Sequence, residues 1–242
     1  LITTIGFTWN FAIEASLYAA TVLAFWPMKT PFLQHRPADS NASPLSDFLE
    51  GLRYVRKQER VIWNLLVVGL IPNVLLHPVW FVLPVFTVEV LHRTADTGGV
   101  LLAVTGFGGL LSALTIASVG FGANRGLICL WAVLVSSAAV VLFAYSPWLV
   151  PAAILIGLMS LAQATFRTSS STLIQSMVPD HLRSRITSLH RYSQGIVFMF
   201  SLAVGLLVDL PTVVLALAAV GIAGLVLGSI SYLVLPRVRQ AR

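Results

Sequence analysis

Charged residues are scarce in this chain, and their scarcity excludes a domain folded in water. Only 15 of the 242 residues are Lys or Arg and only 9 are Asp or Glu, whereas 57% are hydrophobic. The mean hydropathy is +0.88. A soluble domain carries charge on about a quarter of its residues, because its surface must face water. We therefore expect the lipid bilayer to be the solvent and the main partner of this chain.

Cysteine and catalytic motifs are also nearly absent. Cys129 stands alone inside an apolar run, so neither a disulfide framework nor a cysteine-cluster metal site is possible within the chain. The sequence holds no H-E-x-x-H, no G-x-S-x-G and no Walker-type glycine loop. We expect no enzymatic activity, no bound metal and no cofactor. The basic residues are scattered over short connections rather than gathered on one face, which argues against a nucleic-acid partner.

Long apolar runs are what the sequence does contain. A helix crosses the roughly 30 Å hydrocarbon core of a bilayer with about 20 residues, and the runs are about that long. We predict an all-α polytopic membrane protein, a helical bundle of about seven transmembrane helices. The predicted spans are residues 5–27, 61–88, 98–119, 127–146, 149–175, 186–208 and 212–235.

The distribution of Lys and Arg predicts the orientation, because these residues accumulate in cytoplasmic loops. Arg93 is the only basic residue in a predicted outer connection. The other connections and the tail hold Lys29, Arg36, Arg53, Arg56, Lys57, Arg60, Arg125, Arg183, Arg185, Arg237, Arg239 and Arg242. We expect a plasma-membrane protein in which the N-terminus of the chain lies outside and the C-terminus lies in the cytoplasm.

Four parts follow from this pattern. They are a single span (1–28), a cytoplasmic linker (29–60), a six-helix bundle (61–235) and a basic cytoplasmic tail (236–242). The end of the linker has two interpretations. Apolar residues recur on one helical face there, which favours an amphipathic helix on the membrane surface, at Phe48, Leu49, Leu52 and Val55. A solvated charged connector fits the same stretch.

Four sequence patches resemble the second half of the major facilitator superfamily. They are DFLEGLRYVRKQE (47–59), VWFVLPVFTVEVL (79–91), GVLLAVTGFGGLLSAL (99–114) and TLIQSMVPDHLRSRITSL (172–189). The branch they resemble most is that of bacterial exporters related to enterobactin and macrolide efflux proteins. The resemblance runs from the family's sixth helix to its twelfth, so the first span would belong to a missing N-terminal half of the same transporter.

The resemblance implies a secondary transporter that exports a small molecule, drug-like or siderophore-like, by alternating access in exchange for protons. It also implies gating charges in two cytoplasmic turns. The first turn, SVGFGANRG (118–126), keeps Arg125 but has Phe121 near the position of the family's acid. The second turn matches the family's P-D-x-x-R-G-R at Asp180, Arg183 and Arg185, although Ser184 replaces the glycine.

Ionisable residues at membrane depth are costly, which makes each of them a candidate for function. Arg167 lies within a predicted span, on a polar stripe with Ser160, Gln163, Ser170 and Ser171. Such a stripe would be wasteful against lipid, so we expect it to face a substrate cavity. The alternative is an arginine that extends to the cytoplasmic headgroups or braces a neighbouring helix.

Asn73, His77 and Trp80 form a second polar stripe, on a span that also holds Pro72, Pro78 and Pro84. Prolines free backbone carbonyls and allow bending, which suits a gating helix that lines a cavity. His77 could carry a proton, and the alternative is a hydrogen-bonded packing residue.

Glu14 is the remaining candidate for proton coupling, since a carboxyl group in hydrocarbon is readily protonated. A hydrogen bond between helices is the alternative role. We also expect small residues to form a packing seam along 98–119, at Gly99, Ala103, Gly106, Gly109 and Ala113.

Two other functions fit seven spans. A seven-helix receptor has the same predicted topology, although the last span lacks the lysine that a retinal protein needs. A membrane scaffold or partner subunit that transports nothing is the other alternative.

Overall fold

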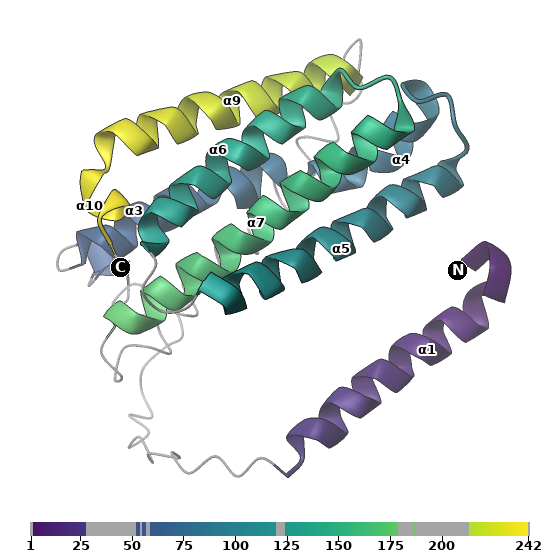
Figure 1. The fold of residues 1–242 in the computed structure, drawn as a ribbon, viewed down its shortest axis with the longest axis horizontal. Coiled ribbons are helices and arrows are strands. Elements are labelled where there is room, and N and C mark those ends of the chain that lie inside the picture. The colour runs from purple at the N-terminus through teal and green to yellow at the C-terminus, as the bar shows by residue number, and fades with distance from the viewer. Residues whose placement is uncertain are drawn as a thin grey trace. The chain divides into compact units, whose positions relative to one another are not determined.

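A computed structural model describes residues 2–27, 52–53, 55–56, 59–119, 124–178, 186 and 213–241 (Figure 1). Regular structure in these ranges is helical throughout, which confirms the predicted all-α class. The elements are α1 (Ile2–Phe25), α3 (Arg60–Leu70), the π-helix η1 (Ile71–Leu76), α4 (Val79–Glu89), α5 (Ala95–Val119), α6 (Arg125–Ala144), α7 (Leu149–Met177), α9 (Val213–Val234) and α10 (Pro236–Arg239).

The chain divides into two compact units, Leu1–Ala42 and Ser43–Arg242. The first unit contributes α1, whose described side chains are all exposed. The helices lie where the apolar runs predicted them, to within a few residues. The predicted span 186–208, except Ile186, the linker 29–42 and most of the predicted amphipathic helix at 43–60 lie outside the described residues.

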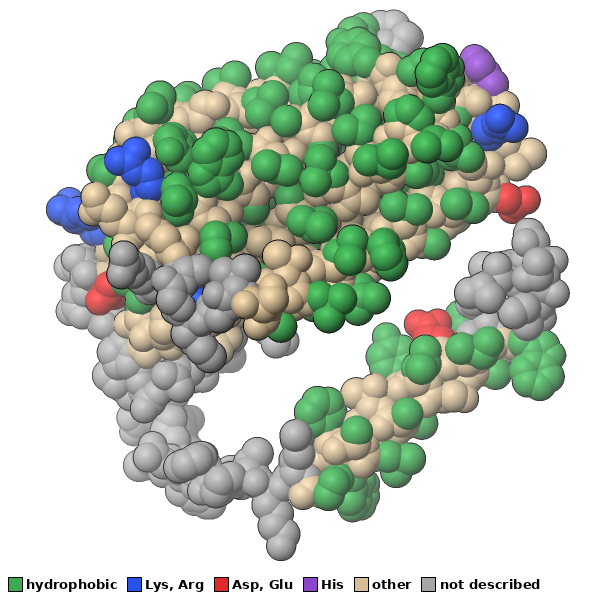
Figure 2. All heavy atoms as spheres, in the orientation of Figure 1, with side chains coloured by type: hydrophobic (Ala, Val, Ile, Leu, Met, Phe, Trp, Pro, Cys, Tyr) green, Lys and Arg blue, Asp and Glu red, His purple; other side chains and the backbone are tan. Residues whose placement is uncertain are grey.

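The second unit has helices of membrane-spanning length and an apolar surface, as a membrane protein does. Five helices in the described ranges are long and apolar enough to cross a bilayer: Arg60–Glu89, Asp96–Ser118, Arg125–Ala144, Leu149–Met177 and Val213–Val234. Figure 2 shows hydrophobic side chains over the visible flank of this unit and charged side chains at its two ends. An apolar flank with charged ends fits a bundle whose sides face lipid.

The first of these five spans is not a uniform α-helix. It passes from α3 into the π-helix η1 and then, through a turn at His77 and Pro78, into α4. Pro78 has no N–H, so the carbonyl four residues before it loses its α-helical donor. A π turn offers that carbonyl a donor one residue further along. Of the prolines that predicted bending, Pro72 lies within the widened π-helix η1, and Pro78 lies in the turn that follows it.

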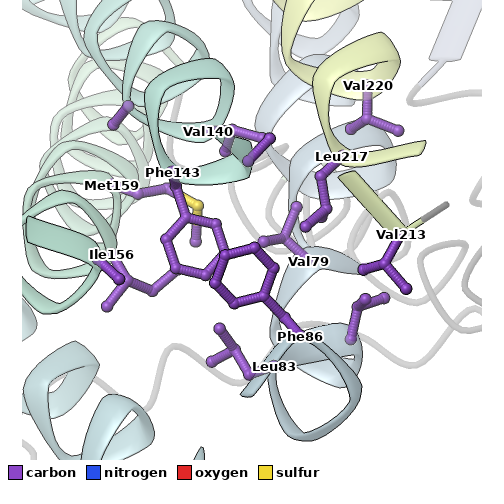
Figure 3. Close-up of a cluster of buried hydrophobic side chains, with 14 of the residues drawn as sticks. Val79, Leu83, Phe86, Val140, Phe143, Ile156, Met159, Val213, Leu217 and Val220 are labelled. Atoms are coloured by element: carbon purple, nitrogen blue, oxygen red, sulfur yellow. The ribbon is translucent and has the colours of Figure 1, made fainter. Parts of the chain in front are cut away.

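Two apolar clusters hold the bundle together at different depths. The first contains Leu65, Val68, Ile71, Leu130, Val133, Phe166 and Leu173. The second contains Leu76, Leu83, Phe86, Val140, Phe143, Ile156 and Met159 (Figure 3). In the second cluster the rings of Phe86 and Phe143 stack with their centroids 4.2 Å apart. Both clusters draw on η1, α6 and α7, so the two clusters are successive layers of one bundle.

Glycines let α6 and α9 approach closely. A Cβ atom on Gly221 would lie 2.9 Å from the backbone nitrogen of Val141, and one on Gly224 would lie 2.6 Å from Ser137 Oγ. Gly228 continues the same face of α9, against Leu134 and Val133. In lipid, helices associate largely through such close packing of small residues.

The expected small-residue seam on α5 lies on a different face. Gly99, Gly106 and Gly109 have open space where a Cβ would be, and Ala103 and Ala113 are exposed. The contact with α7 is instead made by the neighbouring face of α5, at Leu101, Thr105, Gly108 and Ser112. Within the described part of the chain, the predicted stripe has no packing partner.

The C-terminal segment folds back onto the start of α6. The amide of Gly126 donates a hydrogen bond of 3.1 Å to the carbonyl of Ala241, and the Val238 carbonyl lies against Gly126. Asn124 accepts a bond from the Leu127 amide and so caps the same helix. Val238 is fully buried and belongs to the first apolar cluster. The sequence predicted the tail from its charge alone, and the structure shows in addition that the tail packs on α6.

The glycine seam predicts that Gly221→Ala lowers the free energy of unfolding by about 1–3 kcal/mol, because the added methyl group meets the rigid backbone of Val141. Gly106→Ala is the matched control, since its methyl group enters open space and removes the helix penalty of glycine, about 1 kcal/mol. Unfolding of the purified protein in mixed micelles, titrated with a denaturing detergent, measures both. Equal stability of the two variants would contradict the seam.

Candidate functional site

A polar layer lies between the two apolar clusters. On η1, Asn73 falls between Ile71 of the first cluster and Leu76 of the second. On α7, Gln163 falls in the same way between Phe166 and Met159. On α6 the corresponding residues are Ser136 and Ser137. We call Asn73, Ser136, Ser137 and Gln163 the polar layer; each is at most 5% exposed.

Contacts between α3 and α7 place Asn73 and Gln163 at a similar depth along the bundle. A Cβ on Gly69 would touch the ring of Phe166 at 3.5 Å and would lie 3.9 Å from Asn73 Nδ2. Gln163 precedes Phe166 by three residues, about 4.5 Å along a helix, and Asn73 follows Gly69 by four. The cluster memberships show that the two helices run antiparallel, because Leu65 and Leu173 share the first cluster whereas Leu83 and Ile156 share the second.

Two buried donors at this site have no hydrogen-bond partner. They are Gln163 Nε2 and Trp80 Nε1, and they are the only such buried side-chain atoms among the described residues. The serines of the layer differ, because both Ser136 and Ser137 donate to the carbonyl of Val133. Leaving a buried donor unpaired costs about 1–3 kcal/mol. The site therefore keeps an unmet demand for hydrogen-bond acceptors.

Arg167 lies one turn beyond Gln163 on α7 and is partly buried. Side chains on a helix lean toward its N-terminus, so Arg167 leans toward Gln163 and the middle of the span. On the neighbouring span, His77 follows Asn73 of the polar layer by four residues, so it lies about one turn further along that span. No carboxylate in the described ranges pairs with Arg167.

Aromatic rings form the other side of the site. The His77 and Trp80 rings have centroids 4.9 Å apart and planes tilted by 30°, and the Phe81 ring lies edge-on to His77 at 6.2 Å. Both His77 and Trp80 are partly buried. The turn between η1 and α4 thus holds a histidine and an indole side by side. We call His77 and Trp80 the aromatic shelf.

The structure separates the other predicted site residues from this group. Ser160 donates a 2.6 Å hydrogen bond to the Thr105 carbonyl, so its hydroxyl joins α7 to α5. Ser170 is fully buried and donates to the Arg167 carbonyl at 3.2 Å, and Ser171 accepts a bond from Gln175. The serines of the predicted stripe therefore join or shape helices, while Gln163 and Arg167 keep donors for a ligand.

The remaining proton-coupling candidate, Glu14, and the gating candidates fall in other parts of the sequence. Glu14 is exposed on α1, in the first unit. Arg125 begins α6, directly after the capping residue Asn124. Asp180, Arg183 and Arg185 lie outside the described residues, so the predicted gating role of the second cytoplasmic turn stays a prediction.

Ser136 and Ser137 were not among the predicted site residues. The sequence did contain a signal, because they are adjacent serines in the middle of a run that is otherwise apolar from Leu127 to Ala144. Their hydroxyls bond within α6, so the two serines add polarity to the layer without offering a free donor.

A comparison with protein families finds one match, described as Major Facilitator Superfamily, over residues 1–202. No curated protein matches the chain.

The unpartnered amide predicts an opposite effect on stability and on activity. Gln163→Met keeps the shape of the side chain and removes the buried donor, so the free energy of unfolding should stay equal or rise by up to about 1–3 kcal/mol. Activity should fall, because the donor available to a ligand is lost. Detergent titration of the purified protein gives the first quantity and transport in vesicles gives the second.

Gln175→Met is the control on the same helix, since Gln175 is exposed and already bonded to Ser171. It should change neither quantity appreciably. A large loss of stability in Gln163→Met would mean that the amide has a structural partner and would contradict the assignment.

Proposed function

This chain belongs to the major facilitator superfamily and is a multi-pass membrane protein and a secondary transporter, and from that premise we propose that it exports a drug-like or siderophore-like small molecule in exchange for protons. Members of the family are transporters and not enzymes. The family match favours a transporter over the receptor and scaffold alternatives. We propose the direction of transport, the class of substrate and the coupling ion.

The observation that carries the proposal is the polar layer beside a broken helix. Secondary transporters bind their substrates near the middle of the bilayer, where discontinuous helices present polar groups. In this chain the π-helix η1 interrupts a span at the depth of Asn73 and Gln163. Polar groups in hydrocarbon are costly and persist where function needs them.

We assign substrate contacts to Arg167, Gln163, Asn73, His77 and Trp80. Arg167 and Gln163 supply donors from α7, and the broken helix supplies the amide and the aromatic shelf. Ser160 and Ser170 act indirectly in this scheme. Their hydroxyls hold α7 against α5 and shape the backbone at Arg167, which keeps the donors in place.

Proton coupling has two candidate carriers. The His77 and Trp80 ring centroids lie 4.9 Å apart, and His77 follows Asn73 of the polar layer by four residues, so a change in its protonation would alter the charge where the substrate is proposed to bind. Glu14 is the only carboxylate within α1, and its neutral form suits a membrane span. The gating charges Arg125, Asp180, Arg183 and Arg185 would act at the cytoplasmic turns.

We place the protein in the plasma membrane with its basic end in the cytoplasm. Arg56, Arg60, Arg125, Arg237 and Arg239 belong to connections and ends on one side, whereas Arg93 belongs to the α4–α5 connection on the other. Basic residues concentrate on the cytoplasmic side of membrane proteins.

The orientation predicts the accessibility of two exposed positions. In a background that carries Cys129→Ser, Arg93→Cys should react with an impermeant thiol reagent added to intact cells, while Arg237→Cys should react only after the cells are permeabilised. Cys129 is buried, so the parent protein that keeps it should stay unlabelled and serves as a separate control. Labelling of Arg237→Cys from outside would reverse the topology.

Transport itself is tested with the intact transporter in sealed vesicles. With an imposed pH gradient, at least one compound of a panel of aromatic cations, aromatic carboxylates and neutral macrolides should accumulate, and a protonophore should abolish the accumulation. At least one of Glu14→Gln and His77→Gln should lose gradient-driven accumulation and keep substrate counterflow. Arg93→Gln, in an outer connection, is the control and should keep both.

Accumulation that ignores the pH gradient in the parent protein would contradict proton exchange. Absence of transport for every compound in the panel, with correctly inserted protein, would contradict the export function.

A further inference from the structure

The two buried donors without a partner, together with Arg167, favour a ligand that carries hydrogen-bond acceptors. Arg167 has five N–H donors and no acceptor, and the indole of Trp80 has one donor and no acceptor. The unpartnered atom of Gln163 is its Nε2, also a donor. No acid pairs with Arg167 in the described ranges. A ligand that satisfies this set must bring oxygen acceptors, and a negative charge on them would offset the charge of Arg167.

The geometry of α7 suits a carboxylate in particular. Gln163 and Arg167 are four residues apart and so lie on the same face on successive turns. A guanidinium binds a carboxylate through two parallel hydrogen bonds, which a point charge such as lysine does not reproduce. The Gln163 amide can donate to the same group from the next turn. These two side chains together form a donor pair that fits one carboxylate.

The aromatic shelf adds a second requirement. The centroids of the His77 and Trp80 rings lie 4.9 Å apart, both side chains are partly exposed, and His77 follows Asn73 of the polar layer by four residues. Flat rings favour offset or tilted stacking with other aromatic rings, at about 0.5–1.5 kcal/mol beyond the burial of area. An aliphatic ligand would gain the burial but not the stacking.

From these observations we infer that the substrate is an aromatic carboxylic acid bound as its anion. Its carboxylate lies on Arg167 and Gln163, and its ring lies against the aromatic shelf. This inference rests on the proposed export function and narrows its substrate to one chemical class. It differs from an aromatic cation, which the Arg167 charge would repel.

Three probes of matched shape separate the two requirements. 2-Naphthoate has the ring and the charge, 2-naphthamide has the ring without the charge, and decahydro-2-naphthoate has the charge without the aromatic ring. Binding of each radiolabelled probe to the intact transporter in nanodiscs is measured, with empty nanodiscs as the blank for partition into lipid. 2-Naphthoate should bind about tenfold or more tightly than the amide and about two- to tenfold more tightly than the saturated acid.

Two variants test the assignment through these preferences. Arg167→Lys should lose most of the preference for 2-naphthoate over 2-naphthamide, while Trp80→Leu should lose the preference for 2-naphthoate over the saturated acid. Each preference is a ratio within one preparation, so partial misfolding of a variant does not change it. Arg93→Lys and Trp131→Leu are the controls, since both residues are exposed away from the polar layer. They should keep both preferences.

Three results would overturn the inference. They are equal binding of 2-naphthoate and 2-naphthamide to the parent protein, an undiminished charge preference in Arg167→Lys, and an undiminished ring preference in Trp80→Leu. If aromatic cations are transported under a pH gradient while 2-naphthoate neither binds nor moves, the substrate class is wrong and the export function stands. If no compound of the panel is transported, the export function itself fails.

Discussion

Hydrocarbon offers the polypeptide backbone no hydrogen bonds, and the architecture of this protein follows from that constraint. Each span satisfies its own amides and carbonyls as a helix, since an unpaired backbone group in lipid costs several kcal/mol. Helices that are complete in this way gain little from burial among equally apolar lipid tails, so their association depends on close packing. The glycines of α9 against α6, and Gly108 of α5 against α7, provide close approaches between spans of the second unit.

The same constraint makes the broken helix informative. Pro72, Pro78 and Pro84 remove donors from one span, which has a π-helix at Pro72, a turn at Pro78 and an α-helix around Pro84 rather than an open loop. The two apolar clusters hold the span firmly above and below this segment. The bundle tolerates a polar layer between the two apolar clusters because both clusters are closely packed. The two apolar clusters stabilise the bundle, and the buried donors without a hydrogen-bond partner lie between the clusters.

Much of the fold could be predicted from composition and run length, because a bilayer imposes both on any spanning helix. The prolines also predicted where the second span would deviate, but not that it would widen into a π-helix, which depends on the contacts of its neighbours. The seam on α5 shows the limit of periodicity. Gly99, Gly106 and Gly109 share one face and Gly108 lies on another, and the face that packs was decided by the partner helix α7.

The candidate site was predicted in part. The polar stripe on α7 identified Arg167 and Gln163, yet a stripe could not distinguish a free donor from one that is already bonded. Ser160 has the same spacing and polarity as Gln163, but a carbonyl of α5 occupies its hydroxyl. The adjacent serines of α6 were not predicted, because the candidates were mainly ionisable residues and serine carries no charge. Hydrogen-bond partners from other helices, which no single stretch of sequence contains, made the difference.

The hydrogen bond between Gly126 and Ala241 also has a consequence for biosynthesis. The start of α6 obtains one of its acceptors from a residue at the far end of the sequence. The ribosome synthesises the chain from the N-terminus to the C-terminus, so α6 enters the membrane long before Ala241 is made. The end of the bundle that holds the first apolar cluster therefore reaches its final packing only when translation of the tail is finished, and insertion of the spans must precede that step.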